Sequence, residues 1–290
     1  MQIIVDNLTY TYSESSKALS HKALDGVSLT INEGEFFGII GKTGSGKSTF
    51  VQHLNGLIKI GKDKGKITVG DYDLSQKKVD FRSLRAKVGM VFQYPEAQLF
   101  AETVYNDVAF GLRNFFPETT EEEIAKKVEQ ALSLVGLDYE KVKDKSPFEL
   151  SGGQKRRVAI AGVIVTRPEV LVLDEPAAGL DPVGKREFIK LLRTLHSTFV
   201  KTIIIVSHDM DLVAENCTGV AVFANGKILK QGKPKQVFSD AQFIKEQGLE
   251  LPVTAKLQNA LKEKGVIVDS DLTVDGFISA YLQQKGVVKA

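Results

Sequence analysis

The clearest chemical pattern in the sequence is a glycine-rich segment from Gly41 to Ser48. It has the order G-x-x-x-x-G-K-S, follows the apolar run Phe36 to Ile40 and precedes an expected helix, Lys47 to about Leu57. Glycines let successive backbone N–H groups surround an anion, and a helix N-terminus adds partial positive charge. The segment predicts a loop that binds nucleotide phosphates. Its residues are Gly41, Thr43, Gly44, Ser45, Gly46, Lys47 and Ser48.

Two side chains of this loop and a downstream carboxylate pair predict phosphate chemistry. Lys47 would place its charge on the β- and γ-phosphates, and the Ser48 hydroxyl would be a ligand of Mg²⁺. The apolar run Val170 to Leu173 ends in Asp174 and Glu175, at the edge where open α/β sheets bind ligands. We expect Asp174 to hold Mg²⁺ through water and Glu175 to polarise the water that attacks the γ-phosphate. A solvated Asp-Glu turn is the alternative, which the phosphate loop disfavours.

Two further polar residues follow apolar runs that we expect to be strands. Gln93 follows the run Val88 to Phe92, and His208 follows Ile203 to Val206. The carboxyl ends of parallel strands meet at one edge of a sheet, so both side chains are predicted to converge on the phosphate loop. Each residue taken alone is commonly structural.

Hydrophobic periodicity indicates the elements that position these residues. Short β-rich runs from Gln2 to Phe37 predict antiparallel strands, whereas residues 94–167 read as helical, with a capping box at Thr120 and Glu123. Buried β-branched runs then alternate with helical stretches, which implies βαβ units, and Asn225-Gly226 predicts a hairpin. After about residue 235 the chain predicts short helices, which we interpret as a small C-terminal subdomain over 236–290.

Composition restricts the class of protein. The chain has 290 residues, 43% of them hydrophobic and 26% charged, with a net charge of +2. This charge is too small for a protein that binds nucleic acid by covering its phosphates, so no nucleic-acid partner is expected. One cysteine, Cys217, excludes an internal disulfide and gives no indication of an oxidising compartment.

The sequence predicts no membrane-spanning segment. No stretch without Asp, Glu, Lys or Arg is longer than 11 residues, the length of Ser48 to Ile58, and spanning a bilayer takes about 20 apolar residues. The N-terminus has no pattern of a secretory signal. Any membrane role is therefore expected to depend on a partner.

The segment Leu150-Ser151-Gly152-Gly153-Gln154-Lys155, with the phosphate loop upstream and the carboxylate pair downstream, resembles the signature of ATP-binding cassette (ABC) ATPases over about residues 1–235. The resemblance implies an α/β P-loop ABC ATPase core with a mainly parallel sheet, an N-terminal antiparallel β-subdomain, a helical subdomain inserted at about 94–167 and a small C-terminal helical extension. It also implies ATP hydrolysis with Mg²⁺. In that family Ser151, Gly152, Gly153 and Gln154 would face ATP held by a second chain.

Other positions match the family residue by residue. Gln93 corresponds to the Q-loop glutamine, which with Ser48 and Asp174 would complete the magnesium ligands, and Asp181 corresponds to the D-loop aspartate. His208 matches the switch histidine that contacts the γ-phosphate. Thr49 extends the nucleotide contacts. Tyr12 best matches the aromatic residue that stacks on adenine, with Tyr10 as a neighbouring candidate.

A narrower resemblance is to the A-component ATPases of energy-coupling factor (ECF) transporters, which import vitamins and transition-metal ions. It is carried by Val91 to Phe100, Val108 to Gly111 and Leu150 to Gly162. The run Asp174 to Asp181 and the C-terminal extension, expected to mediate dimerisation, resemble the second of two paralogous ATPases. That paralogue pairs with the first, whereas cobalt and nickel relatives use one ATPase twice.

The resemblance also implies membrane partners. A groove near Gln93 to Phe100 would receive the coupling helices of the transmembrane T-component, and the substrate-binding S-component would be contacted indirectly. The protein would lie at the cytoplasmic face of the cell membrane. As a hypothesis, Glu96 meets an arginine of a coupling helix.

Three other readings remain open at this point. A soluble ABC ATPase acting on DNA or ribosomes is disfavoured because only 57 residues separate Gln93 from Ser151, too few for an inserted coiled coil, and the chain holds one cassette. A P-loop kinase or GTPase leaves Leu150 to Gln154 unexplained. A regulatory subunit without hydrolysis is disfavoured by Glu175 and His208.

Overall fold

The structure, a computed structural model, describes residues 1–12, 21–61 and 64–285, so residues 286–290 of the predicted C-terminal subdomain lie outside the described part. Its centre is a sheet of six strands. In spatial order these are β10 (Lys227–Gly232), β9 (Gly219–Ala224), β3 (Phe36–Ile40), β8 (Thr202–Val206), β7 (Val170–Asp174) and β6 (Val88–Val91). Strands β9 to β6 pair in parallel and β10 pairs antiparallel. The predicted mainly parallel sheet is confirmed.

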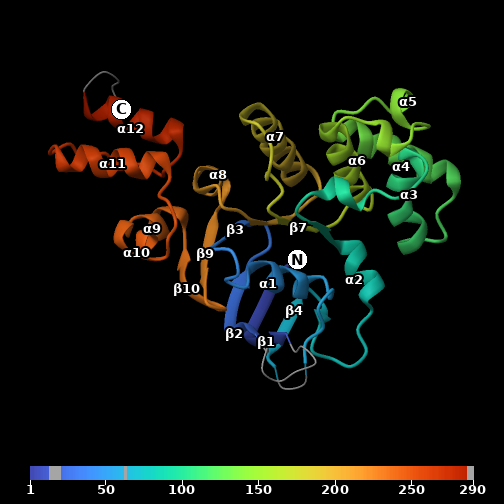
Figure 1. The fold of residues 1–290 in the computed structure, drawn as a ribbon, viewed down its shortest axis with the longest axis horizontal. Coiled ribbons are helices and arrows are strands. Elements are labelled where there is room, and N and C mark those ends of the chain that lie inside the picture. Colours follow the sequence, from blue (N-terminus) through green and yellow to red (C-terminus); the bar gives the residue numbers. More distant parts are fainter. Residues whose placement is uncertain (13–20, 62–63, 286–290) are drawn as a thin grey trace.

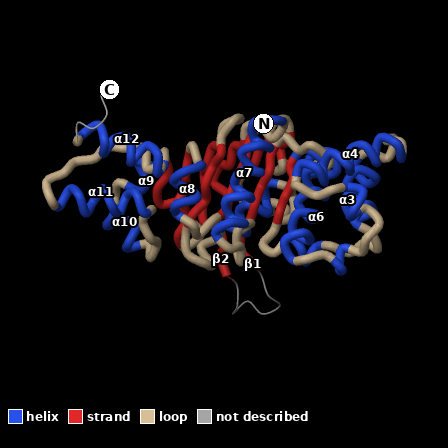
Figure 2. The backbone as a smooth tube through the Cα atoms, turned by 90° about the horizontal axis from the view of Figure 1, so that it is seen from above, coloured by secondary structure: helices blue, strands red, loops and turns tan. Residues whose placement is uncertain are grey.

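The central strands are covered on both faces. Every residue of β3, β7 and β8 is buried, which explains why these strands read as continuous apolar runs. Each buried valine, leucine or isoleucine stabilises the fold by about 1.5–3 kcal/mol. Helix α7 (Pro182–Thr198) joins β7 to β8, and helix α8 (Met210–Asn216) joins β8 to β9. Figure 2 shows both helices lying over the strands.

A second, antiparallel sheet lies below the first in Figure 1. Its order is β2 (His21–Ile31), β1 (Ile3–Tyr12), β4 (Lys66–Val69) and β5 (Tyr72–Asp73). The sequence pattern predicts two short strands, Ile3 to Val5 and Leu8 to Tyr12, where the structure has the single strand β1. The strand continues through a shift in register between Val5 and Leu8, where Asn7 has φ 48°, so the irregularity interrupts the pattern of side chains but not the pairing.

Helix α1 (Lys47–Leu54) begins directly at the glycine-rich loop. It is shorter than the predicted helix to Leu57 because Asn55 caps it and Gly56 has φ 67°, a left-handed conformation that ends a helix. Helix α2 (Phe81–Lys87) precedes β6 and starts at Asp80, whose side chain accepts a hydrogen bond from the Ser83 backbone N–H.

The predicted helical region follows β6 and forms the upper right part of Figure 1. It consists of η2 (Pro95–Gln98), α3 (Val104–Phe115), α4 (Glu121–Leu134), α5 (Tyr139–Val142), η3 (Pro147–Glu149) and α6 (Gly152–Ile164). The predicted capping box of Thr120 and Glu123 is present at the start of α4. A second capping box, formed by Ser151 and Gln154, starts α6.

The C-terminal helices lie at the opposite end of the molecule from α3–α6 (Figures 1 and 2). They are α9 (Pro234–Phe238), α10 (Ala241–Glu246), α11 (Val253–Glu263) and α12 (Val274–Gln284). Val237, Phe238 and Ile244 pack in the same core as the central sheet, whereas no described residue of α12 is buried. No helix within the described ranges is long and apolar enough to cross a membrane.

The single cysteine is part of the core. Cys217 packs beneath β3 at Gly38, where an added Cβ would lie 3.0 Å from the Cys217 Sγ and 2.9 Å from Val213 Cγ1. Burial raises the pKa of the Cys217 thiol, so the thiolate is suppressed and the residue behaves as a small apolar side chain.

Candidate nucleotide site

A cavity of about 550 Å³ lies at the carboxyl edge of the central sheet. Its lining residues are Tyr12, His21, Ala23, Thr43, Gly44, Gly46, Lys47, Ser48, Thr49, Gln93, Glu175 and His208. The structure therefore brings together the phosphate loop and three strand-end residues that the sequence analysis expected to converge. His21 and Ala23 were missed. Tyr12 pairs with His21 across β1 and β2, and no motif indicates that pairing.

The phosphate loop requires glycine at two positions because the backbone passes close to other chain segments. Gly41 has φ 149°, and an added Cβ would lie 2.2 Å from the carbonyl oxygen of Phe223. Gly46 has φ 104°, and its Cβ would lie 2.4 Å from the carbonyl oxygen of Ala23. Any side chain at either position would displace the loop from β9 or β2.

The hairpin between β9 and β10 braces the same loop. The Gly226 N–H donates to the Ser45 carbonyl oxygen at 3.0 Å. Asn225 and Gly226 have φ 50° and 75°, as the type I′ turn predicted from this dipeptide requires. The hairpin fixes one side of the anion-binding loop.

Lys47 is a buried cation at the base of the cavity. Its Nζ donates to the carbonyl oxygens of Gly41 at 2.7 Å and Lys42 at 2.9 Å. Burial lowers the pKa of Lys47, and the carboxylates of Glu175 and Asp174 oppose that effect. Among the described residues, the ammonium group has only neutral carbonyl oxygens as hydrogen-bond acceptors. A bound polyphosphate would offer it charged oxygens, which form stronger hydrogen bonds, so Lys47 is suited to anion binding.

Asp174 has the features of a cation ligand. It is buried at the end of β7, and its Oδ1 has no hydrogen-bond partner. Burial raises the pKa of Asp174, while a hydrogen bond with Ser48 and the charge of Lys47 oppose this. The described residues contain no group of three or more His, Cys, Asp or Glu side chains placed to hold a metal ion by themselves. Hydroxyl, amide and carboxylate oxygens together with water fit Mg²⁺, which keeps several waters.

Glu175 and His208 form a pair at the cavity wall. Nε2 of His208 lies 2.5 Å from Oε1 of Glu175. Glu175 has φ 52°, an uncommon conformation for glutamate, and its N–H donates to the Val206 carbonyl oxygen at 3.0 Å. Burial raises the pKa of Glu175 and the charges of His208 and Lys47 lower it. The geometry places a carboxylate that can accept a proton beside a hydrogen-bonding imidazole.

Tyr12 lies at the mouth of the cavity. Its hydroxyl is 3.2 Å from Thr49 Oγ1, and its ring packs edge-on against Tyr10 at 4.9 Å. Tyr10 packs in turn against His53 at 5.0 Å. Tyr12 rather than Tyr10 lines the cavity, so of the two candidates Tyr12 is placed to meet a base.

The remaining predicted residues lie outside this cavity. Ser151, Gly152, Gly153 and Gln154 are exposed at the start of α6, and Asp181 is exposed at the start of α7. Side chains complete the helix starts: Ser151 Oγ accepts from the Gln154 N–H at 3.3 Å, and Asp181 Oδ1 accepts from the Gly184 N–H at 2.6 Å. Within the described chain, the nucleotide cavity is built without them.

A parallel sheet with a phosphate loop at its carboxyl edge, a carboxylate pair and an exposed glycine-rich helix start defines a P-loop ATPase of the cassette type. The ABC transporter family profile matches residues 24–178. The energy-coupling factor transporter ATP-binding protein EcfA2 of Clostridium tetani is 49% identical over 272 residues, which cover 94% of this chain and 93% of that protein. The protein of the same name from Clostridioides difficile is 50% identical over 273 residues, with 94% and 93% covered.

Solved structures agree. The structure of cbiO1 from Clostridium perfringens, part of the ABC transporter complex cbiONQ, is 42% identical with a TM-score of 0.70 and covers 89% of this chain and 98% of that chain. A dimeric ATP-binding cassette in a post-hydrolysis state bound to ADP and Pi is 28% identical with a TM-score of 0.71, covering 80% and 98%.

The chain therefore belongs to the ABC transporter family, among the ATP-binding proteins of energy-coupling factor transporters. It is an ATPase, and the fold class and family resemblance predicted from the sequence are confirmed.

Proposed function

We propose that the protein is the ATP-hydrolysing subunit of an ECF-type importer at the cytoplasmic face of the cell membrane, where it energises uptake of vitamins or other micronutrients. The observation that supports this most directly is the convergence of Lys47, Gln93, Glu175 and His208 on one cavity. The names of the relatives support the transport role.

The magnesium ligands are assigned to this chain's own oxygens. Ser48, Gln93 and Asp174 would hold Mg²⁺, which when bound neutralises charge on the β- and γ-phosphates. Two observations support the assignment. Oδ1 of Asp174 has no hydrogen-bond partner within the described chain, and the Asp174 side chain also forms a hydrogen bond with Ser48. Glu175 accepts a proton from the attacking water, and His208 holds the Glu175 carboxylate in place and contacts the γ-phosphate.

A second chain completes the site. Residues Ser151 to Gln154 and Asp181 are exposed and do not line the cavity, so they are free to cover ATP held by a partner ATPase. Helix α12 also exposes apolar side chains such as Val274 and Ile278, which suits a dimer contact. We divide the chain into a nucleotide-binding domain (1–235), with its helical subdomain at 94–167, and a C-terminal dimerisation subdomain (236–290).

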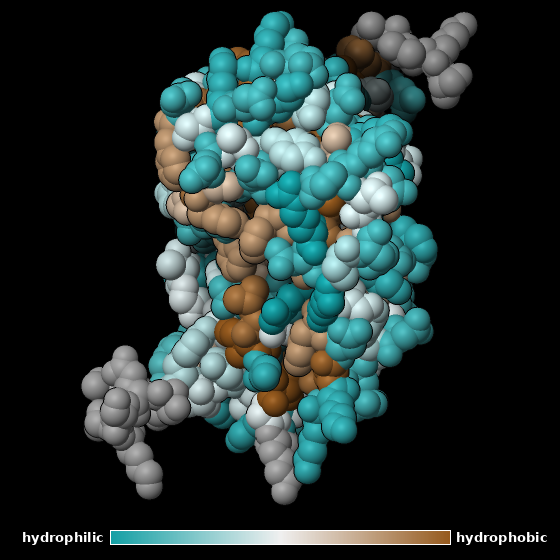
Figure 3. Space-filling model, turned by 90° about the vertical axis from the view of Figure 1, so that its right-hand side faces the viewer, coloured by the Kyte–Doolittle hydropathy of each residue, from teal (hydrophilic) through white to brown (hydrophobic). Residues whose placement is uncertain are grey.

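The membrane subunit would bind in an apolar groove. A cavity of about 470 Å³ is lined by Phe92, Leu99, Phe100, Phe110 and Phe115, together with parts of α2 and α6. Figure 3 shows hydrophobic surface on this face, which runs from the middle of the view into its lower part beneath a hydrophilic upper part. Phe100 is 61% exposed, and a helix of the transmembrane T-component would bury it, with the S-component reached through that subunit.

The test uses Glu175→Gln in the full-length protein. Removing the base should lower the rate of ATP hydrolysis by about 10²- to 10⁴-fold, while ATP binding persists and a closed dimer accumulates with ATP and Mg²⁺. Sedimentation velocity measures the dimer and phosphate release measures turnover. Glu129→Gln, at an exposed position on α4, is the control. Normal turnover by the Glu175 variant would falsify the assignment.

Assembly is tested separately. Pull-down of the tagged protein in mild detergent, followed by mass spectrometry, should recover a transmembrane partner and either a paralogous ATPase or only this chain. Recovery of this chain alone as the ATPase would favour the homodimeric alternative, in which a cobalt or nickel importer uses one ATPase twice, as the cbiO1 likeness allows. Recovery of ribosomes or DNA-bound proteins instead would contradict the transport role.

A further inference from the structure

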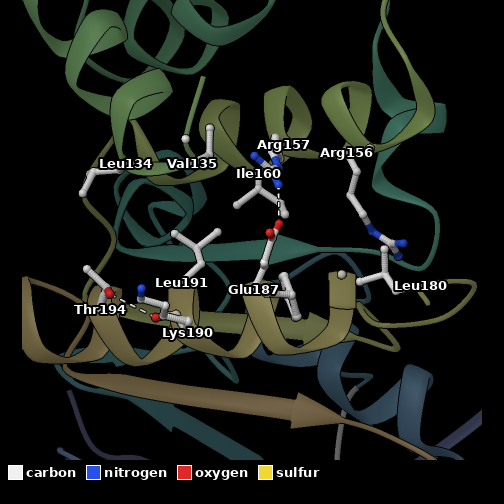
Figure 4. A pocket seen from close by; sticks show the side chains of 14 residues that line it. Leu134, Val135, Arg156, Arg157, Ile160, Leu180, Glu187, Lys190, Leu191 and Thr194 are labelled. Carbon is white, nitrogen blue, oxygen red and sulfur yellow. Dashed lines mark hydrogen bonds and ion pairs between the residues drawn. The ribbon is translucent and has the colours of Figure 1, made fainter. Parts of the chain in front are cut away.

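A buried arginine lies where three functional segments meet. Arg156, on α6, is only 7% exposed. Its Nη1 donates to the carbonyl oxygen of Ala178 at 3.0 Å, and its Nε lies 4.0 Å from Oε2 of Glu96 on η2. Figure 4 shows the side chain leaving α6 toward the loop that contains Leu180.

Most of this polar junction is unpartnered. Nε and Nη2 of Arg156 and Oε2 of Glu96 are buried without a hydrogen-bond partner. Buried charged groups that lack hydrogen-bond partners destabilise a fold, so their presence here suggests a functional role. Burial lowers the pKa of Arg156, and Glu96 opposes that effect. Because charge-assisted bonds form at about 2.8 Å, a relative movement of about 1 Å would convert the 4.0 Å separation into a direct bond.

The neighbouring arginine provides a contrast on the same helix. Arg157 is partly exposed and pairs with Glu187 on α7 at 2.6 Å, across the cavity between α6 and α7 shown in Figure 4. That pair is screened by solvent and contributes little. Arg156, by contrast, is buried, so solvent does not screen its charge.

Each contact of Arg156 leads to a functional segment. Glu96 follows Gln93, which lines the nucleotide cavity, and precedes Leu99 and Phe100, which line the apolar groove. We call residues 95–100 the groove segment. On the other side, the Ala178 N–H donates to the Glu175 carbonyl oxygen at 3.1 Å. Arg156 thus connects the groove segment to the loop that carries the proposed base.

We propose that Arg156 is a positioning residue for ATP hydrolysis, which holds the loop after Glu175 through Ala178 and closes an ion pair with Glu96 when the groove segment moves toward α6. Occupation of the groove would then change the position of Glu175. The role of the groove rests on the proposed function, whereas the effect on hydrolysis does not.

This assignment changes the interpretation of Glu96. From the sequence, the hypothesis for Glu96 is that it meets an arginine of a membrane subunit. In the structure Arg156 of the same chain faces Glu96 at 4.0 Å, and the Glu96 oxygen that faces it is buried. Our proposal gives Glu96 an internal partner in Arg156, whereas its contact with an arginine of a coupling helix stays a prediction.

The experiment measures kcat and KM for ATP with Arg156→Gln, Glu96→Gln and the double variant, in the full-length ATPase with its partner chain. Each single substitution should lower kcat by about tenfold and leave KM for ATP within about twofold. The double variant should be no slower than the slower single variant, because both substitutions remove the same ion pair between Arg156 and Glu96. A merely structural role would instead lower thermal stability and affect KM together with kcat.

The double variant Arg157→Gln/Glu187→Gln is the matched control, and its kcat should stay within about twofold of the parent value. Wild-type kcat in both single variants, or independent effects that multiply in the double variant, would overturn the proposal. If Arg156→Gln does not fold, Glu96→Gln decides the question, because its side chain is partly exposed. Failure of the proposed function would show differently: the unaltered protein would hydrolyse ATP but recover no membrane partner.

Discussion

Lys47 shows how a single buried charge prepares the site for nucleotide. The ammonium group is desolvated, is satisfied by two carbonyl oxygens and has the carboxylates of Asp174 and Glu175 in its surroundings. Carbonyl groups are weaker partners for an ammonium ion than phosphate oxygens. Phosphate can therefore replace them at a gain in free energy.

Lys47→Ala should weaken ATP binding itself by about 10- to 100-fold, as expected for the loss of charge-assisted hydrogen bonds. Isothermal titration calorimetry with ATP and Mg²⁺ measures the change. Lys227→Ala removes an exposed lysine of the β9–β10 hairpin, which pairs with Asp25 on β2, and should leave affinity unaltered. Equal affinities in the two variants would contradict the role of Lys47.

His53 predicts a pH dependence of stability. It is fully buried, its Nδ1 bonds to the Thr49 carbonyl oxygen at 2.7 Å, and its ring faces Tyr10. Burial lowers the pKa of His53 below its ordinary value of 6.5. The unfolded chain therefore binds a proton more readily, and the contribution to stability is complete above pH 6.5 and is lost as the pH falls toward the folded-state value.

Urea denaturation at several pH values between about 5 and 7 measures this effect. His53→Gln, which keeps a donor for Thr49, should flatten the dependence of the unfolding free energy on pH. His21→Gln, at an exposed position, should not. An identical slope in the His53 variant and the parent would rule out His53 as the source.

At the scale of elements, helix starts carry both structure and function. The capping boxes at Thr120 and Ser151 use the same side-chain chemistry. Neither residue lines the nucleotide cavity, and of the two only Ser151 belongs to the glycine-rich segment proposed to cover ATP held by a second chain. A cap at Thr120 should affect stability alone.

Thr120→Ala should lower the free energy of unfolding by about 1 kcal/mol, because the Glu123 N–H loses its side-chain acceptor. ATP hydrolysis should be unaffected. Chemical denaturation of this variant beside Thr119→Ala, whose side chain caps no helix, provides the comparison. A large loss of activity in Thr120→Ala would show that α4 contributes to catalysis.

The sequence predicted those elements whose signals are local. The hairpin at Asn225-Gly226, the capping box at Thr120 and the strands β7 and β8 depend on adjacent residues and appear as expected. Long-range features were not predictable. They depend on packing between distant segments, which no short pattern encodes. Three examples are that Gly41 lies close to Phe223, that His21 lines the cavity and that Arg156 faces Glu96.

At the scale of the molecule, function depends on how separate blocks are joined. The helical region and the C-terminal helices occupy opposite ends, with the central sheet between them (Figure 2). The nucleotide cavity belongs to the sheet, whereas the groove lies at its junction with the helical region. A change at the groove can reach the cavity through α6 and through the segment that follows Gln93.

Ile278→Asp should weaken dimerisation of the ATPase. Ile278 is 48% exposed on α12, so its replacement leaves the isolated chain folded, but a carboxylate in an apolar interface is costly. Analytical ultracentrifugation of the Glu175→Gln background with ATP and Mg²⁺ measures the dimer. Ser279→Asp, on the next residue, adds the same charge at an exposed polar position and is the control. Equal dimer fractions would place the interface elsewhere.

The packing of Cys217 beneath β3 gives the chain a practical property. Since this is the sole thiol in the sequence and it is buried, native protein should react slowly with maleimides and methanethiosulfonates. One introduced cysteine on α4 and another on α11 would therefore accept spin labels or fluorophores selectively without prior removal of natural cysteines. Pulsed electron resonance between such probes could follow the cassette through its whole cycle.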